Sequence, residues 1–162
     1  MPQTVGRGVG RWWVGAGVMF AAAPLCVTLH AQAPDGARIY AAACTACHQA
    51  SGLGIPGQFP PLAGSEWVTG SEERLIRIIL HGIAGEIEVE GETFTGVMPT
   101  WGPTFKDDEL AAVATYVRRA WGNRAGPIST STVTRIRLAT ASRTKPWTAA
   151  ELQQAMRAKP PE

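Results

Sequence analysis

The residues best suited to chemistry form one short motif, Cys44-Thr45-Ala46-Cys47-His48, which has the pattern C-x-x-C-H. On a helical turn, residues at i, i+3 and i+4 share a face, so this spacing presents two thiols and one imidazole together. The thiols can add to the two vinyl groups of haem, and the imidazole can bind its iron. The motif therefore predicts one covalently attached haem c, with thioether links at Cys44 and Cys47 and His48 as an axial ligand.

The cysteine pair has three alternative uses: a disulfide, a redox dithiol, or half of a zinc site. A zinc site needs a second pair of ligands, and the one remaining cysteine, Cys26, lies in an apolar N-terminal run. A redox C-x-x-C is expected in a βαβ setting, whereas this Ala-rich stretch predicts a helix. Haem attachment is therefore the preferred interpretation.

Met98 is the expected second axial ligand. It lies well downstream of His48 and directly before Pro99, which biases it toward an extended conformation suited to holding a thioether against iron. One alternative is that Met98 only fills a gap in the core. Another is that His81 completes a bis-histidine site, although its place at the predicted end of a helix indicates a capping or haem-edge role.

The elements that position these groups are predicted to be helices joined by ordered loops. Asp35 is expected to cap a first helix, which carries Tyr40 on its apolar face and ends near the cysteines. The Gly- and Pro-rich stretch from Ser51 to Gly64 is expected to wrap the His48 side of haem. There, a backbone carbonyl near Pro60 can accept the second ring N–H of His48 and fix its tautomer.

Two further helices and an acidic segment are predicted downstream. The first helix spans Ser71 to Leu80, with Ser71 as its cap. The longest helix opens at Asp107 and is expected to reach Trp121, before Gly122 and Asn123, with Tyr116 near Tyr40. Between them, alternating glutamates predict a short extended or hairpin segment with an acidic outer face, namely Glu86, Glu88, Glu90 and Glu92. That face is either ordinary solvated surface or a docking edge for a basic partner.

Charge and composition divide the 162 residues into three parts. Residues 1–33 carry a net charge of +2, residues 34–123 carry −5 and residues 124–162 carry +5. We expect one domain at 34–123 with two extensions. The total of +2 is too small to predict binding of nucleic acid.

Residues 1–33 are expected to be a signal peptide. Arg7 and Arg11 precede an apolar run from Trp12 to Leu29, and small residues follow at Ala31-Gln32-Ala33. The alternative is an uncleaved membrane anchor, the only case in which we expect contact with a membrane. Export predicts a periplasmic location.

The basic, Ser/Thr-rich extension at 124–162 is expected to be irregular or short-helical. Val133 to Leu138 is predicted to be extended, and a capping box from Thr148 to Glu151 predicts a short helix. The extension is expected either to wrap the domain or to hold a partner.

Residues 35–123 resemble the class I cytochrome c family, within the bacterial c-type cytochromes that serve periplasmic dehydrogenases or oxidases. Three stretches are similar to cytochrome subunits that accept electrons from quinoprotein alcohol or sugar dehydrogenases: Leu80–Ile83, Gly96–Trp101 and Glu109–Val113. The resemblance implies an all-α, small cytochrome c fold around one covalently attached haem. It also implies the following site residues: thioether links at Cys44 and Cys47, axial ligands His48 and Met98, and the carbonyl of Pro60 holding the proximal histidine.

The implied function is that of a periplasmic monohaem electron carrier rather than an enzyme. The expected donor is a dehydrogenase, and the expected acceptor is a terminal oxidase or another cytochrome. With both axial positions filled, oxygen binding and peroxide cleavage would be blocked. The alternative is a haem peroxidase or a gas-binding sensor in which Met98 does not bind the iron.

Overall fold

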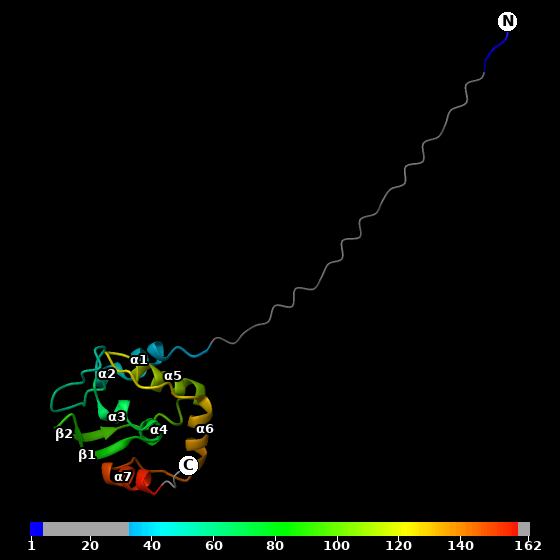
Figure 1. The fold of residues 1–162 in the computed structure, drawn as a ribbon. Helices are drawn as coiled ribbons and strands as arrows, with labels where there is room; N and C mark the ends of the chain where they lie inside the picture. The colour runs from blue at the N-terminus through cyan, green and yellow to red at the C-terminus, as the bar shows by residue number, and fades with distance from the viewer. Residues whose placement is uncertain (5–32, 159–162) are drawn as a thin grey trace. The chain divides into compact units, whose positions relative to one another are not determined.

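The computed structural model describes residues 1–4 and 33–158. Nearly all of the expected leader, including Cys26, lies outside these residues. Within the described part, the chain forms seven helices and one hairpin (Figure 1), so the predicted all-α class is confirmed with a small sheet added. The elements are α1 (Gly36–Ala43), α2 (Thr45–His48), α3 (Glu66–Thr69), α4 (Glu72–His81), β1 (Ile83–Val89), β2 (Glu92–Met98), α5 (Asp107–Val117), α6 (Thr130–Ala139) and α7 (Ala149–Arg157). None of these described helices is long and apolar enough to traverse a bilayer.

Helices α1 and α5 pack directly on each other. The carboxylate of Asp35 accepts the first free amides of α1, as predicted for its cap. A Cβ on Gly36 would lie 2.6 Å from the carbonyl carbon of Ala112 in α5, so only glycine permits this close approach. One helical turn further on, the ring of Tyr40 lies 5.4 Å from that of Tyr116, and this predicted contact is confirmed.

Helix α5 is the longest helix of the described chain, but it ends at Val117 and not at Trp121 as predicted. One face of α5 is buried together with residues of α4 and α6, through Leu110, Ala111, Val113, Ala114 and Val117. The helix stops early because the side-chain amide of Asn123 donates to the carbonyl of Val117 at 2.7 Å. Trp121 then adopts a positive φ of 52°, and its ring packs 5.0 Å from that of Tyr40.

The predicted helix after Ser71 and the predicted hairpin are both confirmed. Ser71 caps α4, and Gly82, with a φ of 78°, ends it. Strands β1 and β2 pair in antiparallel register, and the two-residue turn between them has positive φ at Glu90 and Gly91. The four glutamates do not form one row, because Glu90 lies in the turn and Glu92 accepts the amide of Gly57.

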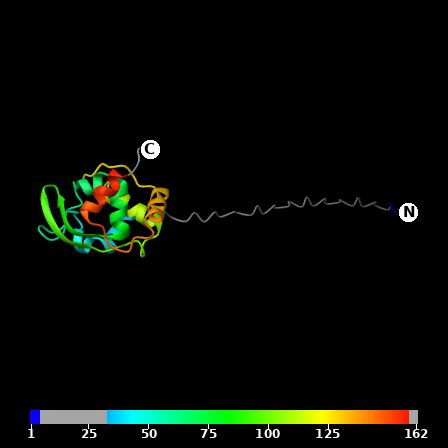
Figure 2. The ribbon, with the colours of Figure 1, turned by 90° about the horizontal axis from the view of Figure 1, so that it is seen from below.

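The C-terminal extension packs against the preceding elements (Figure 2): α6 against α4 and α5, and α7 against β1. The predicted extended piece from Val133 to Leu138 is wrong, since these residues lie in α6. Their β-branched types favour strand locally, but Ser129 caps a helix, and helical spacing buries Val133 and Ile136 completely. The predicted capping box at Thr148 is confirmed at the start of α7.

His81 links the end of α4 to the end of α6. Its Nε2 lies 2.7 Å from the hydroxyl oxygen of Thr140, which itself donates to a carbonyl of α6 and so accepts the Nε2–H. Burial lowers the pKa of His81, and the nearby charges of Arg143, Arg137 and Arg77 lower it further. The fold therefore favours the neutral ring, with its proton on Nε2.

We predict that Gly36→Ala will lower the free energy of unfolding by about 1–3 kcal/mol, because the new methyl group overlaps the α5 backbone. The measurement is urea unfolding of the full chain. Gly126→Ala is the matched control, since a Cβ there meets nothing within 4 Å. Equal stability of the two variants would contradict the tight helix crossing.

Acidification should destabilise the fold at His81, because it places a charge on a partly buried ring beside three arginines. Its pKa in the folded chain lies below the unfolded value of about 6.5, so its contribution is complete above that value and is lost as the pH falls. We expect unfolding free energy to fall more between about pH 7.5 and pH 5.5 in the parent than in His81→Gln. Parallel pH profiles for the two proteins would show that His81 does not contribute.

Candidate functional site

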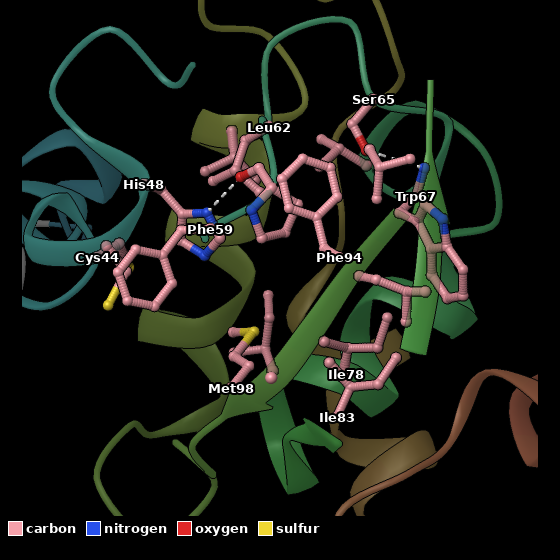
Figure 3. A pocket seen from close by; sticks show the side chains of 18 of the residues that line it. Cys44, His48, Phe59, Leu62, Ser65, Trp67, Ile78, Ile83, Phe94 and Met98 are labelled. Carbon is pink, nitrogen blue, oxygen red and sulfur yellow. Dashed lines mark hydrogen bonds between the residues drawn. The ribbon is translucent and has the colours of Figure 1, made fainter. Parts of the chain in front are cut away.

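An apolar pocket brings the predicted site residues together (Figure 3). It lies between α2, the loop that follows it, α4 and the hairpin. Its lining includes all five residues singled out from the sequence: Cys44, Cys47, His48, Pro60 and Met98. Most of the remaining lining is aliphatic or aromatic, so the pocket suits a large apolar group.

His48 is held by a hydrogen bond from one ring nitrogen, which leaves the other ring nitrogen free to bind a metal. Its backbone amide bonds the carbonyl of Cys44 at 2.9 Å, which gives the helical turn that places both residues on one face. Its Nδ1 lies 3.0 Å from the carbonyl oxygen of Pro60, which can only accept, so Nδ1 carries the proton. Burial lowers the pKa of His48, and the bond to Pro60 opposes this. The result is a neutral imidazole whose Nε2 lone pair is available to a metal.

Met98 enters the pocket from a different wall. It is the last residue of β2 and is half-buried, and its thioether sulfur points into the pocket (Figure 3). The chain after it is tied to the end of α4, because the amide of Trp101 donates to the carbonyl of Ile79 at 3.0 Å and the Thr100 hydroxyl donates to that of Leu80. The end of a strand therefore positions the sulfur, and the extended conformation predicted for Met98 is confirmed.

The two cysteines at the pocket are not joined by a disulfide. Burial, together with the neighbouring thiol of Cys47, raises the pKa of Cys44 to about 11. Before haem is attached, Cys44 is thus a neutral thiol at physiological pH. In the described part of the chain, no group of three or more His, Cys, Asp or Glu side chains could hold a metal ion.

A pair of glycines shows what shape of group the pocket fits. Gly85 and Gly96 face each other across the hairpin, and both line the pocket. A Cβ built on either one meets no atom within 4 Å, so open space lies over this bare stretch of backbone. Ile87 and Phe94 border it on one side and Ile83 on the other. A flat, wide, apolar group such as haem fits over such a surface.

Sequence reasoning missed the role of Asn123, which it treated only as a helix end. Its Oδ1 accepts the amide of Gly64 at 2.9 Å, and its Nδ2 donates to the carbonyls of Leu62 and Val117. It therefore ties the loop beside His48 to the end of α5. The only sign of this role in the sequence was that an asparagine, with its side-chain amide, directly follows the predicted end of the helix.

The rival ligand His81 is not among the residues that line the pocket. Its ring contacts Thr140 and lies edge-on to Trp147, with ring centroids 6.4 Å apart. The structure therefore brings Met98, and not His81, into the space that His48 faces.

Comparison with known proteins also indicates a site that binds haem. Residues 31–117 match the family described as cytochrome C oxidase, cbb3-type, subunit III. Cytochrome c-552 of Thermus thermophilus is 48% identical over 93 residues, covering 55% of this chain and 70% of that protein. The cytochrome c subunit of an alcohol dehydrogenase (quinone) from Gluconacetobacter polyoxogenes is 33% identical over 105 residues, covering 63% of this chain and 22% of the subunit.

A third relative is the Cbb3-type cytochrome c oxidase subunit FixP of a Bradyrhizobium strain, 34% identical over 94 residues, or 57% of this chain and 29% of the subunit. The chain spans 62% of a second Thermus thermophilus cytochrome c-552 and less than a third of the dehydrogenase and oxidase subunits. The likeness therefore concerns one haem-binding domain. The chain belongs to the cbb3-type cytochrome c oxidase subunit III family, and it is a c-type cytochrome, an electron carrier with covalently attached haem.

Proposed function

We propose that the protein carries single electrons through one six-coordinate haem c, with His48 and Met98 as axial ligands. Cys44 and Cys47 form the thioether links, and Pro60 orients the proximal imidazole. The observation that carries this proposal is that an imidazole nitrogen and a thioether sulfur from different elements enter one apolar pocket beside two thiols. When bound, haem supplies the one-electron iron couple, and a thioether ligand raises its potential relative to bis-histidine ligation.

The residues around the ligands have separate tasks. The hydrogen bond from His48 Nδ1 to Pro60 fixes the ring and raises its basicity as a ligand. Asn123 holds the loop that carries this carbonyl. The apolar lining, which includes Ile78 and Phe94, keeps water away and so helps to set the potential.

The proposed partners are a dehydrogenase as electron donor and a terminal oxidase or another cytochrome as acceptor. Support comes from the relatives, whose names place them in an alcohol dehydrogenase, a fructose dehydrogenase and a cbb3-type oxidase.

We propose that residues 1–33 direct export to the periplasm. Residues 34–123 then form the haem domain, with 124–162 as its extension.

We predict that Met98→Ala will lose the Met–Fe(III) charge-transfer band and gain both carbon monoxide binding and peroxidase activity. An alanine leaves the sixth position without its ligand, so small molecules can reach it. Absorption spectra of the oxidised, reduced and carbon monoxide-treated proteins test this. Met156→Ala, in α7, is the matched methionine control. If Met98→Ala behaves like the parent, Met98 is not the axial ligand.

The acidic side of the hairpin should attract cationic redox partners. Glu86 and Glu88 are exposed on the face of the hairpin opposite to the pocket, paired in register with Thr95 and Thr93. We predict that the double variant Glu86→Gln, Glu88→Gln will react several-fold more slowly with a cationic cobalt complex at low salt, and with a weaker salt dependence.

The control for this prediction removes two charges elsewhere, by Glu72→Gln with Asp108→Asn, both of which are exposed. Ferricyanide, an anionic oxidant, should respond in the opposite direction to the hairpin variant. Stopped-flow oxidation rates give the comparison. If both double variants change the rates equally, only net charge matters, and the hairpin is not a docking edge.

A further inference from the structure

We propose that the C-terminal extension holds Met98 in the pocket, with Trp147 and Arg137 as positioning residues that keep the sixth coordination position closed. This inference rests on the proposed role of Met98 as a ligand. It assigns a task to a segment that the family match, which ends at residue 117, does not cover.

The first anchor lies beside the strand that pairs with Met98. Ile83 is the register partner of Met98 in the hairpin, and on its other side it forms a parallel bridge with Trp147. The amide of Trp147 donates to the carbonyl of Gly82 at 3.0 Å, and its carbonyl accepts the amide of Ala84 at 2.8 Å. Trp147 thus acts as one residue of a third strand at the end of the hairpin where Met98 lies.

This pairing matters because a two-stranded hairpin alone is marginally stable in water. Trp147 is 7% exposed and forms a cluster with Ile78, Ile83 and Leu152 of α7, and Met98 packs against that cluster. Without the extension, the hairpin end that carries the thioether would lose both an added strand and an apolar support.

Two guanidinium groups fix the indole of Trp147. That of Arg143 lies 3.4 Å from the ring centroid, and that of Arg77 lies 5.2 Å from it. The indole N–H is buried without a hydrogen-bond partner in the structure. Trp147 therefore acts through its aromatic ring and its backbone, so we expect phenylalanine at this position to keep its function.

The second anchor holds the chain that follows Met98. Arg137 of α6 donates to the carbonyls of Gly102 at 2.7 Å and Phe105 at 2.8 Å, and its Nε lies 2.6 Å from the carboxylate of Asp107. Such charge-assisted bonds are stronger than neutral ones. Met98 is therefore tied on both sides, through Ile83 to Trp147 and through the following loop to Arg137.

The test compares Trp147→Ala and Arg137→Gln with the conservative variants Trp147→Phe and Arg137→Lys, all as full-length holoproteins. Both disruptive variants should weaken the Met–Fe(III) band and lower the carbon monoxide concentration at which the ferrous spectrum begins to shift by at least about tenfold, equal to about 1.4 kcal/mol. Trp147→Phe should stay close to the parent. Arg137→Lys should lie between the parent and Arg137→Gln, because lysine keeps the charge but loses the fork of donors.

Two controls separate positioning from general stability. Leu138→Ala, in the same helix as Arg137 and 73% exposed, should change nothing. Leu110→Ala, in the buried core of α5 and outside the pocket lining, should lower stability without increasing carbon monoxide binding. If Trp147→Ala does not yield folded holoprotein, Arg137→Gln decides the question.

Unchanged band intensity and carbon monoxide affinity in the disruptive variants would overturn the inference. So would an equal effect of Leu110→Ala, because the extension would then contribute stability only. A parent protein that lacks the band and binds carbon monoxide would instead overturn the proposed function. The two failures are therefore distinguishable in one set of spectra.

Discussion

The hydrogen bond between His48 and the carbonyl of Pro60 is the interaction on which the site depends. It joins the short helix α2 to an irregular loop, and it leaves one imidazole nitrogen for iron. Asn123 then ties this loop to the end of α5. The packing of α1 on α5 in turn supports α2. One side of the pocket is thus built through contacts between distant parts of the chain.

The opposite side of the pocket is formed by the hairpin of β1 and β2. Met98 lies at the end of a two-stranded hairpin, and Gly85 and Gly96 leave the adjoining backbone bare for a flat group. The hairpin is supported by α4 before it and, in our proposal, by the C-terminal extension beside it. A haem bound between the two sides would extend the apolar core, since most of the pocket wall consists of aliphatic and aromatic side chains.

Local signals explain most of what could be predicted from the sequence. The C-x-x-C-H spacing, the caps at Asp35, Ser71 and Thr148, and the glutamate alternation each depend on neighbouring residues, and the corresponding elements are confirmed. The errors arose where distant contacts decide. Val133 to Leu138 is helical because α6 buries its apolar face against α4 and α5, and α5 ends at Val117, whose carbonyl binds Asn123, which also binds the distant Gly64 and Leu62. The roles of the paired glycines and of Trp147 were not predicted, because Gly85 and Gly96 face each other only once the strands pair, and Trp147 reaches β1 from a distant part of the chain.

The most direct test of the central claim is one absorption series on the parent protein, exported by a host that attaches haem. Spectra are recorded for the oxidised protein, the reduced protein and the reduced protein under carbon monoxide. A c-type spectrum with a Met–Fe(III) charge-transfer band and no response to carbon monoxide is the predicted result. A spectrum that shifts with carbon monoxide, or a missing Met–Fe(III) band, would contradict the proposed pair of axial ligands, His48 and Met98.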